Sequence, residues 1–271
     1  MNHSVDKEIT IWGASTAFLN FNPKVIEDSL NYPTINMGID GTPIDQYGGL
    51  LKEYLGYTKN SKYIIIAVDV HGGLGDRKKL YHFHNWAHHV ANNYVYDYLA
   101  DIDSERLFKT RYVPFYALTQ YDKHALPYFR KTLMGNNSDD LLENRGYVSN
   151  GSGYLDLATY NKEPVHYEIA IGERGYQKLK NISQEILGKG VTPIIVITPC
   201  YVKGFDQLTN VDQVLSLIYD LKQPGLEIFD YSRCSISSNH TFFKDNTHLN
   251  SLGAIELSKL LAADVKSLEN E

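Results

Sequence analysis

Short, uninterrupted apolar runs are the feature of this chain that most constrains its fold. The clearest is Tyr63–Val70, in which Ile64 to Val68 follow one another without a polar residue. Such a run is typical of a strand in a parallel sheet that is covered by helices on both faces. Four more apolar runs have the length of strands, and they cover residues 9–12, 34–37, 193–198 and 226–231.

Segments with helical features separate these runs. Pro23–Leu30 starts with two helix signals, Asn22 as the N-cap and Pro23 at the first helical position. Strands that alternate with helices predict a three-layer α/β/α fold around an open parallel five-stranded sheet. Ligands of such sheets bind at the carboxyl ends of the strands. The other predicted helices cover residues 44–57, 175–187, 206–221 and 251 to about 266.

The interval 71–167 has a different character. It holds 12 of the 21 tyrosines and 7 of the 10 histidines, and it contains no convincing core strand. Residues 92–134 have helical character interrupted at Pro114 and Pro127, whereas the Asn-, Ser- and Gly-rich residues 136–153 indicate a loop. The length of 271 residues fits a single α/β domain over residues 1–271, with 71–167 inserted as a lid or substrate wall. The alternative is a set of tyrosine-rich helices that pack without a ligand.

Composition argues against several classes of binding partner and bears on where the protein is located. The net charge is −6 and no run of Lys or Arg occurs, so a nucleic-acid partner is not expected. No stretch approaches the roughly 18–20 apolar residues of a membrane-spanning helix. Cys200 and Cys234 lack metal-binding spacing, and neither a structural metal nor a cofactor is expected. The first residues lack a signal-peptide pattern, so the chain as given is expected in the cytoplasm, or in the cell envelope or secreted if a leader has been removed.

Two segments far apart in the sequence carry residues suited to nucleophilic catalysis. Ser15 follows the first predicted strand, two residues after Gly13, although a plain turn has the same pattern. Asp245 and His248 are three residues apart, in a loop before the last predicted helix. In a turn-like conformation the Asp245 carboxylate reaches the His248 Nδ1–H, which leaves Nε2 free as a base. The alternative is that Asp245 caps the helix.

A serine hydroxyl needs such a base, because its own pKa is far too high for ionisation near neutral pH. His248 is suited to take the proton from Ser15 and return it to the leaving group. Asp245 then fixes the imidazole tautomer and stabilises the imidazolium.

These residues together resemble the SGNH hydrolase superfamily, also called GDSL-like lipases and esterases. Gly13-Ala14-Ser15 is similar to its first sequence block, residues 36–41 to the second, and Asp245-Asn246-Thr247-His248 to the last. The resemblance covers residues 8–70 and 172–265 and leaves the interval outside. It implies a flavodoxin-like sheet with Ser15 as nucleophile.

The same resemblance implies an oxyanion hole formed by the N–H groups of Ser15 and Gly38. More narrowly, the chain resembles the branch that includes alginate O-acetylation proteins and D-alanyl lipoteichoic-acid transfer proteins. Phe18, Asn22 and Pro23 after the serine are similar to the opening of that branch, and so is the segment Tyr176–Tyr201.

One position departs from the family pattern. Its third block has an Asn that donates to the oxyanion, and Asp69 stands at that position here. An ionised carboxylate cannot donate a hydrogen bond and repels a developing oxyanion. Asp69 is therefore protonated, points elsewhere or has another role, such as a structural hydrogen bond to loop amides. His71 is the alternative donor.

The aromatic and histidine residues of the interval suggest further contacts. His84 and His88 have the i, i+4 spacing with which one helix face can offer two metal ligands, but surface histidines are the simpler interpretation. The rings of Trp86 and Tyr94, like that of His71, are candidates for substrate binding, because aromatic faces stack on sugar rings. Tyr94, Tyr96 and Tyr98 cannot all share one helix face, so some of them are expected to pack internally.

Two classes of function follow. The first is a serine-dependent acyl-ester hydrolase or O-acyltransferase that acts on a short-chain acylated carbohydrate, a cell-surface polymer or another small acyl ester. The second is a non-catalytic carbohydrate-binding or assembly protein built on a degenerate fold of the same kind, which the Asp69 substitution favours.

Overall fold

A computed structural model describes residues 5–72, 74–120, 143–160 and 165–269. Its centre is one five-stranded sheet in the order β2-β1-β3-β4-β5, in which every pairing is parallel. This confirms the predicted α/β/α class, and the strands lie within one or two residues of the apolar runs. They are β1 (Ile9–Trp12), β2 (Thr34–Asn36), β3 (Tyr63–Val68), β4 (Thr192–Ile197) and β5 (Glu227–Asp230).

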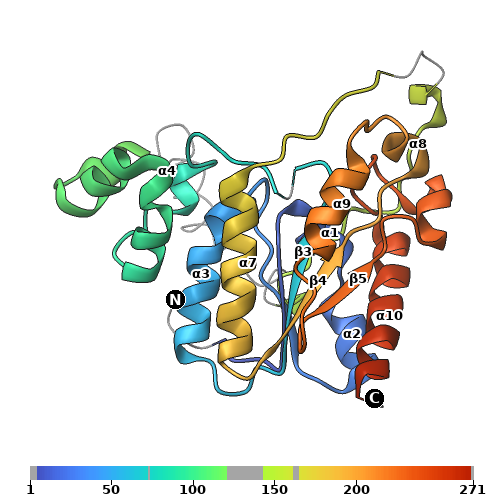
Figure 1. The fold of residues 1–271 in the computed structure, drawn as a ribbon, viewed down its shortest axis with the longest axis horizontal. Helices are drawn as coiled ribbons and strands as arrows, with labels where there is room; N and C mark the ends of the chain where they lie inside the picture. Colours follow the sequence, from blue (N-terminus) through green and yellow to red (C-terminus); the bar gives the residue numbers. More distant parts are fainter. Residues whose placement is uncertain (1–4, 73, 121–142, 161–164, 270–271) are drawn as a thin grey trace.

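Helices cover both faces of the sheet (Figure 1). The first face carries α3 (Ile44–Tyr57), α7 (Glu173–Gly188) and α9 (Val211–Tyr219). The second carries α1 (Ser15–Asn20), α2 (Pro23–Leu30) and α10 (Ser251–Leu268). The short elements are α8 (Val202–Phe205), η1 (Phe83–Asn85), η2 (Tyr116–Gln120), η3 (Leu157–Tyr160), η4 (Ser235–Ser238) and η5 (His240–Phe242).

Strand side chains alternate between two hydrophobic cores. On β3, Ile64 and Ile66 enter the core under α3 and α7, and Ile65 and Ala67 enter the core under α10. Because successive side chains of a strand point to opposite faces, an unbroken apolar run fills both cores at once. After β1 the chain adds β2 on one side and then β3 on the other, so the strand order switches between β1 and β3. Open α/β sheets bind ligands at such a switch point.

The interval 71–167 packs against α3, on its side away from the sheet, through α4 (Asn93–Tyr112) (Figure 1). Val95, Leu99 and Leu107 are fully buried in the same core as the apolar side chains of α3. The helix is kinked at Asp103, and it ends two residues before Pro114, earlier than the expected helical region 92–134. The expected break at Pro127 lies outside the described residues.

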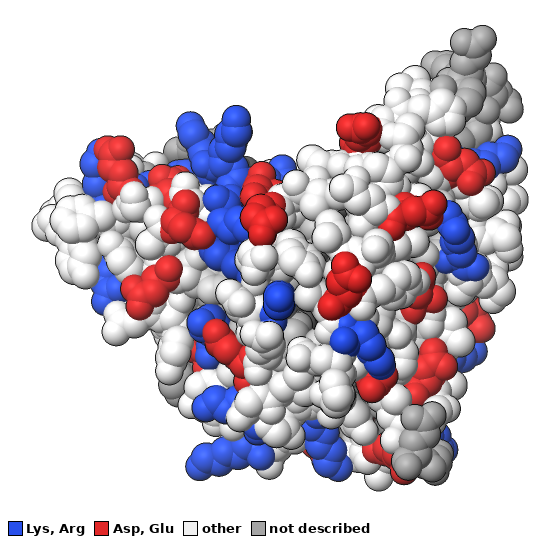
Figure 2. All heavy atoms as spheres, in the orientation of Figure 1, with Lys and Arg blue, Asp and Glu red and all other residues white. Residues whose placement is uncertain are grey.

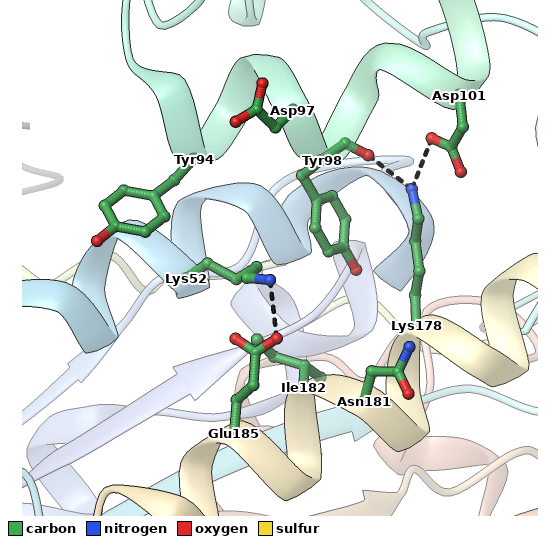
Figure 3. Close-up of a pocket in the computed structure, with 9 residues that line it drawn as sticks. All are labelled: Lys52, Tyr94, Asp97, Tyr98, Asp101, Lys178, Asn181, Ile182 and Glu185. Atoms are coloured by element: carbon green, nitrogen blue, oxygen red, sulfur yellow. Dashed lines mark hydrogen bonds and ion pairs between the residues drawn. The ribbon is translucent and has the colours of Figure 1, made fainter.

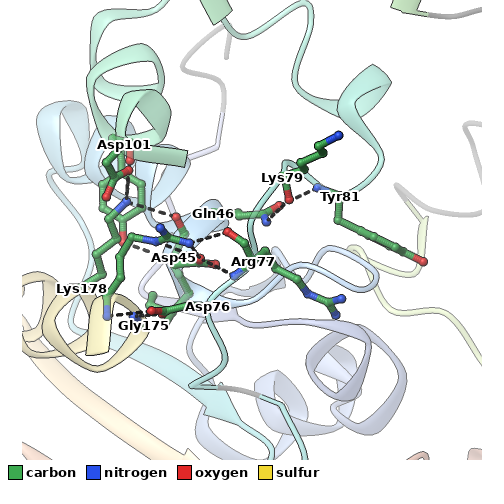
Figure 4. Close-up of polar contacts among 12 residues, drawn as sticks. Asp45, Gln46, Asp76, Arg77, Lys79, Tyr81, Asp101, Gly175 and Lys178 are labelled. Atoms are coloured by element: carbon green, nitrogen blue, oxygen red, sulfur yellow. Dashed lines mark hydrogen bonds and ion pairs between the residues drawn. The ribbon is translucent and has the colours of Figure 1, made fainter. Parts of the chain in front are cut away.

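Polar contacts tie the start of the interval to the helices beneath it (Figure 4). Asp76 accepts hydrogen bonds from the backbone N–H groups of Gly175 at 2.7 Å and Arg174 at 3.2 Å, at the first turn of α7. Asp45, on the first turn of α3, accepts from the Arg77 N–H at 3.2 Å. The segment after β3 is therefore fixed to two helices and is part of the folded body.

The end of the interval lies against the second face. The Val148 N–H donates to the Phe18 carbonyl at 3.0 Å, and the Ser251 N–H donates to the Gly151 carbonyl at 2.8 Å. These bonds place the loop expected at residues 136–153, as far as it is described, against α1 and the start of α10. Among the described residues, every helix is too short or too polar to cross a bilayer.

Candidate active site

Ser15, His248 and Asp245 meet at the carboxyl edge of the sheet. Ser15 follows β1 and begins α1, and the other two residues lie in the loop between η5 and α10. The Ser15 Oγ and His248 Nε2 are 2.8 Å apart, although 233 residues separate them in the chain. The His248 Nδ1 lies 2.8 Å from Asp245 Oδ2. This is the hydrogen-bond relay that general-base activation of a serine requires.

The local turn fixes Asp245 and explains the three-residue spacing. Its Oδ1 accepts the backbone N–H groups of Thr247 at 3.0 Å and His248 at 2.9 Å. The alternative interpretation of Asp245 as the helix cap is wrong, because Asn250 caps α10 through the N–H groups of Leu252 and Gly253. Asp245 is thus left to face the imidazole.

Electrostatics favour a charged pair in this relay. Burial alone would raise the pKa of Asp245, but hydrogen bonds from His248 and the Thr247 N–H outweigh it and hold this pKa at about 2. Burial alone would lower the pKa of His248, but Asp245, with Asp69 and Asp40 further off, raises it above its ordinary value. The site therefore stabilises the imidazolium that forms when His248 takes the serine proton.

A buried asparagine holds the His248 loop in place, and sequence reasoning missed it. The Asn20 Nδ2 donates to the Thr247 carbonyl at 2.9 Å, and its Oδ1 accepts the Leu249 N–H at 2.8 Å. Asn20 thus binds the backbone on both sides of His248, and its own side chain is fully buried. The only sequence signal is a polar residue in the otherwise apolar segment 17–21.

The expected oxyanion role of Gly38 does not fit this conformation. Its N–H already donates to the Asn36 Oδ1 at 3.0 Å, and the Asn36 Nδ2 is bound to the carbonyls of Ala17 and Phe21. Among the described residues, no acceptor binds the Ser15 N–H, so this donor is unpaired. A glycine is nonetheless required at position 38, because a Cβ there would lie 2.7 Å from the Phe18 nitrogen.

Asp69 has the structural role that was the alternative for it. Its Oδ1 accepts the Gly72 N–H at 2.9 Å and so closes the turn after β3. The carboxylate brings negative charge toward His248 and supplies no donor.

His71 does not replace the missing donor either. Its Nδ1 lies 2.9 Å from the Tyr167 Oη, and its Nε2 lies 3.2 Å from the Cys200 Sγ. Both ring nitrogens are therefore engaged by protein groups. Burial lowers the pKa of His71, which keeps the ring neutral near pH 7.

The two aromatic residues proposed for substrate binding lie elsewhere. The interpretation of Trp86 is wrong, because its ring is 1% exposed in the core and its Nε1 donates to the Tyr81 carbonyl. Tyr94 is 50% exposed, but it lines a groove between α3, α4 and α7 that includes no residue of the Ser15 site. Figure 3 shows this groove.

The His84 and His88 segment does not form the helix on which the metal interpretation depends. Residues 83–85 form the 3₁₀ helix η1 and turns follow, so the helical i, i+4 arrangement is wrong. Within the described ranges, no group of three or more His, Cys, Asp or Glu side chains is placed to hold a metal ion. Cys200 and Cys234 are both free thiols.

Charge on the visible face of the molecule is mixed. Figure 2 shows Lys and Arg interspersed with Asp and Glu over α3, α7 and α9, without an extended patch of either sign.

Comparison with known proteins adds no family. No protein-family model matches the chain, and no curated protein matches it. The resemblance to SGNH hydrolases thus rests on the sequence blocks, and the case for chemistry rests on the geometry around Ser15.

Proposed function

We propose that this protein is a serine-dependent acyl-ester hydrolase or O-acyltransferase that acts on a short-chain acylated carbohydrate or cell-surface polymer. One observation carries the proposal: the hydrogen-bonded series from Ser15 Oγ through His248 to Asp245, built from two remote segments. Ser15 and His248 are only partly buried, so a substrate can reach them from solvent.

In the first half-reaction, the Ser15 Oγ attacks the acyl carbonyl while its proton passes to His248 Nε2. The carbonyl oxygen takes up negative charge beside the Ser15 N–H. The tetrahedral intermediate collapses as the ester C–O bond breaks, and the leaving alkoxide takes the proton from His248. The products of this half are the alcohol and an acyl-Ser15 ester.

In the second half-reaction, water or a sugar hydroxyl gives its proton to His248 and attacks the acyl-Ser15 carbonyl. Collapse returns the proton to Ser15 Oγ and releases a carboxylic acid or a new acyl ester. Asp245 stabilises the imidazolium in both halves. The acceptor decides between hydrolysis and transfer.

The shortage of hydrogen-bond donors for an oxyanion favours a second function, a non-catalytic carbohydrate-binding or assembly role. Gly38 has its N–H bound to Asn36, and Asp69 offers no N–H. Loss of one oxyanion donor costs about 10²–10³ in rate, so a protein with a single donor is a poor esterase unless Gly38 leaves Asn36 when substrate binds.

The test compares the wild type with Ser15→Ala and His248→Ala on a chromogenic short-chain acyl ester, with and without a methyl glycoside as acceptor. The control is Ser29→Ala, which removes an exposed hydroxyl on α2. A fluorophosphonate label located by mass spectrometry reports the nucleophile independently of turnover. We expect labelling of Ser15, and loss of both label and activity in the two site variants.

The outcomes separate the two functions. Free acid as the product indicates hydrolysis, and an acylated glycoside indicates transfer. Full activity in Ser15→Ala contradicts the nucleophile assignment. Absence of both turnover and label in the wild type supports the binding role.

A further inference from the structure

A groove between α3, α4 and α7 is not used by the proposed chemistry (Figure 3). Its volume is about 450 Å³, within the range typical of small-molecule sites, and Lys52, Tyr94, Asp97, Lys178, Asn181 and Glu185 line it among others. Because none of the groove residues belongs to the Ser15 site, the two sites can be tested separately.

Glycines in α3 let α4 approach closely and hold the tyrosines of this groove. A Cβ at Gly48 would lie 2.1 Å from the Tyr98 Oη, and one at Gly56 would lie 3.3 Å from the Tyr94 Oη. The Tyr98 Oη in turn donates to the Ile44 carbonyl at 2.9 Å. The packing sets the floor of the groove and leaves half of the Tyr94 side chain exposed.

The cations of the groove are already paired with carboxylates. The Lys52 Nζ lies 2.7 Å from Glu185 Oε1, and the Lys178 Nζ lies 2.8 Å from Asp101 Oδ1 (Figure 3). Lys178 also donates to the Tyr98 and Asp45 carbonyls, which uses all three of its N–H donors. With three carboxylates against two ammonium groups, the groove disfavours an anionic ligand.

Three exposed polar groups of the groove have no hydrogen-bond partner in the described part of the chain: the Tyr94 hydroxyl, the Asp97 carboxylate and the Asn181 amide. A carboxylate accepts hydrogen bonds from hydroxyl groups, an amide both donates and accepts them, and a tyrosine face packs against sugar C–H groups. This set matches a polyhydroxylated ring better than an apolar ligand, since Ile182 is the one aliphatic residue of the lining.

We infer that this groove is a binding site for an uncharged sugar unit, with Tyr94 stacked on the ring and with Asp97, Asn181 and Lys52 bound to its hydroxyls. Binding here does not depend on Ser15. If the groove also anchors a polymeric substrate for the Ser15 site, that additional role rests on the proposed function.

Saturation-transfer NMR of the full chain tests the site, with neutral methyl glycosides and N-acetylglucosamine as probes and glucuronate and inorganic phosphate as anionic comparisons. The variants are Tyr94→Ala, Asp97→Asn and Asn181→Ala. The matched control is Tyr112→Ala, which removes another exposed tyrosine of α4 that lies outside the groove. Circular dichroism melting checks that each variant is folded.

We expect at least one neutral glycoside to receive saturation, with affinity about tenfold lower in Tyr94→Ala and unchanged in Tyr112→Ala. The Ser15→Ala variant should bind as the wild type does, whether or not the ester assay shows turnover. No saturation of any neutral probe, stronger binding of glucuronate or phosphate, or equal binding by folded Tyr94→Ala and Asp97→Asn proteins overturns the inference.

Discussion

His248 reaches Ser15 because Asn20 binds the backbone on both sides of it. We expect Asn20→Ala to lower kcat by about 10²-fold, because a displacement of about 1 Å in a catalytic group has an effect of that size. The same change removes two buried hydrogen bonds, which lowers the free energy of unfolding by roughly 1–3 kcal/mol. Ester hydrolysis and urea denaturation measure the two effects.

The control for Asn20→Ala is Asn22→Ala. Asn22 caps α2 through the Lys24 N–H, and loss of a helix cap costs about 1 kcal/mol without disturbing the His248 loop. If both variants kept the wild-type kcat, Asn20 would have no positioning role.

The negative charge of Asp69 affects the pH dependence of the reaction, because it raises the pKa of His248. His248 acts as a base only when neutral, and its pKa lies above the ordinary value, so kcat/KM should rise with pH through that raised pKa. Asp69→Asn removes a charge that raises this pKa, so the rising limb should move to lower pH. The amide oxygen that this substitution introduces can still accept the hydrogen bond of the Gly72 N–H. Its NH₂ group is a new donor, and a hydrogen bond from it to the oxyanion would raise kcat by up to about 10²-fold.

Asp40→Asn separates the two effects of Asp69→Asn. Asp40 also raises the pKa of His248, so its neutralisation should move the limb in the same direction, without the gain in kcat. A limb that stays in place in Asp69→Asn, or moves to higher pH, contradicts this account.

The residues of the Ser15 site differ in how far sequence predicts them. Ser15, Asp245 and His248 can be predicted, because Ser15 follows a strand end and the other two residues are three apart in one local turn. Asn20 and Asn36 could not be predicted, since their partners are backbone groups of other segments of the chain. The substrate-binding interpretation of Trp86 is wrong because burial depends on tertiary packing and not on the polar residues beside it in the sequence.

At the scale of elements, apolar runs predicted the strands well and helical spacing predicted the helices less exactly. The expected helix 206–221 is shorter in the structure, where α9 (Val211–Tyr219) begins after Asn210. The Asn210 side chain binds both the N–H and the carbonyl of Ile169, at 2.7 and 3.0 Å. A contact 41 residues distant thus sets the start of the helix, and no periodicity within the segment encodes it.

The close approach of β1 and β3 beside Ser15 gives a prediction at this scale. A Cβ at Gly13 would lie 2.7 Å from the Ala67 carbonyl oxygen and 2.8 Å from the Ala17 Cβ. We expect Gly13→Ala to lower the free energy of unfolding by about 1–3 kcal/mol and to reduce kcat as the strand end shifts. Urea denaturation and ester hydrolysis provide the readouts.

Gly188→Ala is the matched control, because a Cβ at the end of α7 meets no atom within 4 Å. It should leave stability unchanged or slightly higher, as alanine favours helix over glycine. Equal stability of the Gly13→Ala protein and the wild type would falsify the close-packing argument.

At the scale of the whole molecule, one buried cluster joins the sheet domain to the interval 71–167 (Figure 4). Asp45 is fully buried, and the Arg174 Nη2 lies 3.0 Å from its Oδ2. Burial raises the pKa of Asp45 despite this pairing. Because Asp45 also accepts the Arg77 N–H, the cluster couples α3, α7 and the segment after β3.

Removal of one partner of this cluster should destabilise the whole fold. Arg174→Met leaves the Asp45 charge buried without its cation, which costs about 3–5 kcal/mol in the free energy of unfolding. The penalty should be much smaller in an Asp45→Asn background, where no charge is left unpaired. Because the pKa of Asp45 in the folded state is raised, protonation at mildly acidic pH should also relieve part of the penalty. Urea denaturation of the four proteins at neutral and mildly acidic pH measures this coupling, and a penalty that is the same in both backgrounds and at both pH values would show that Arg174 stabilises the fold by packing alone.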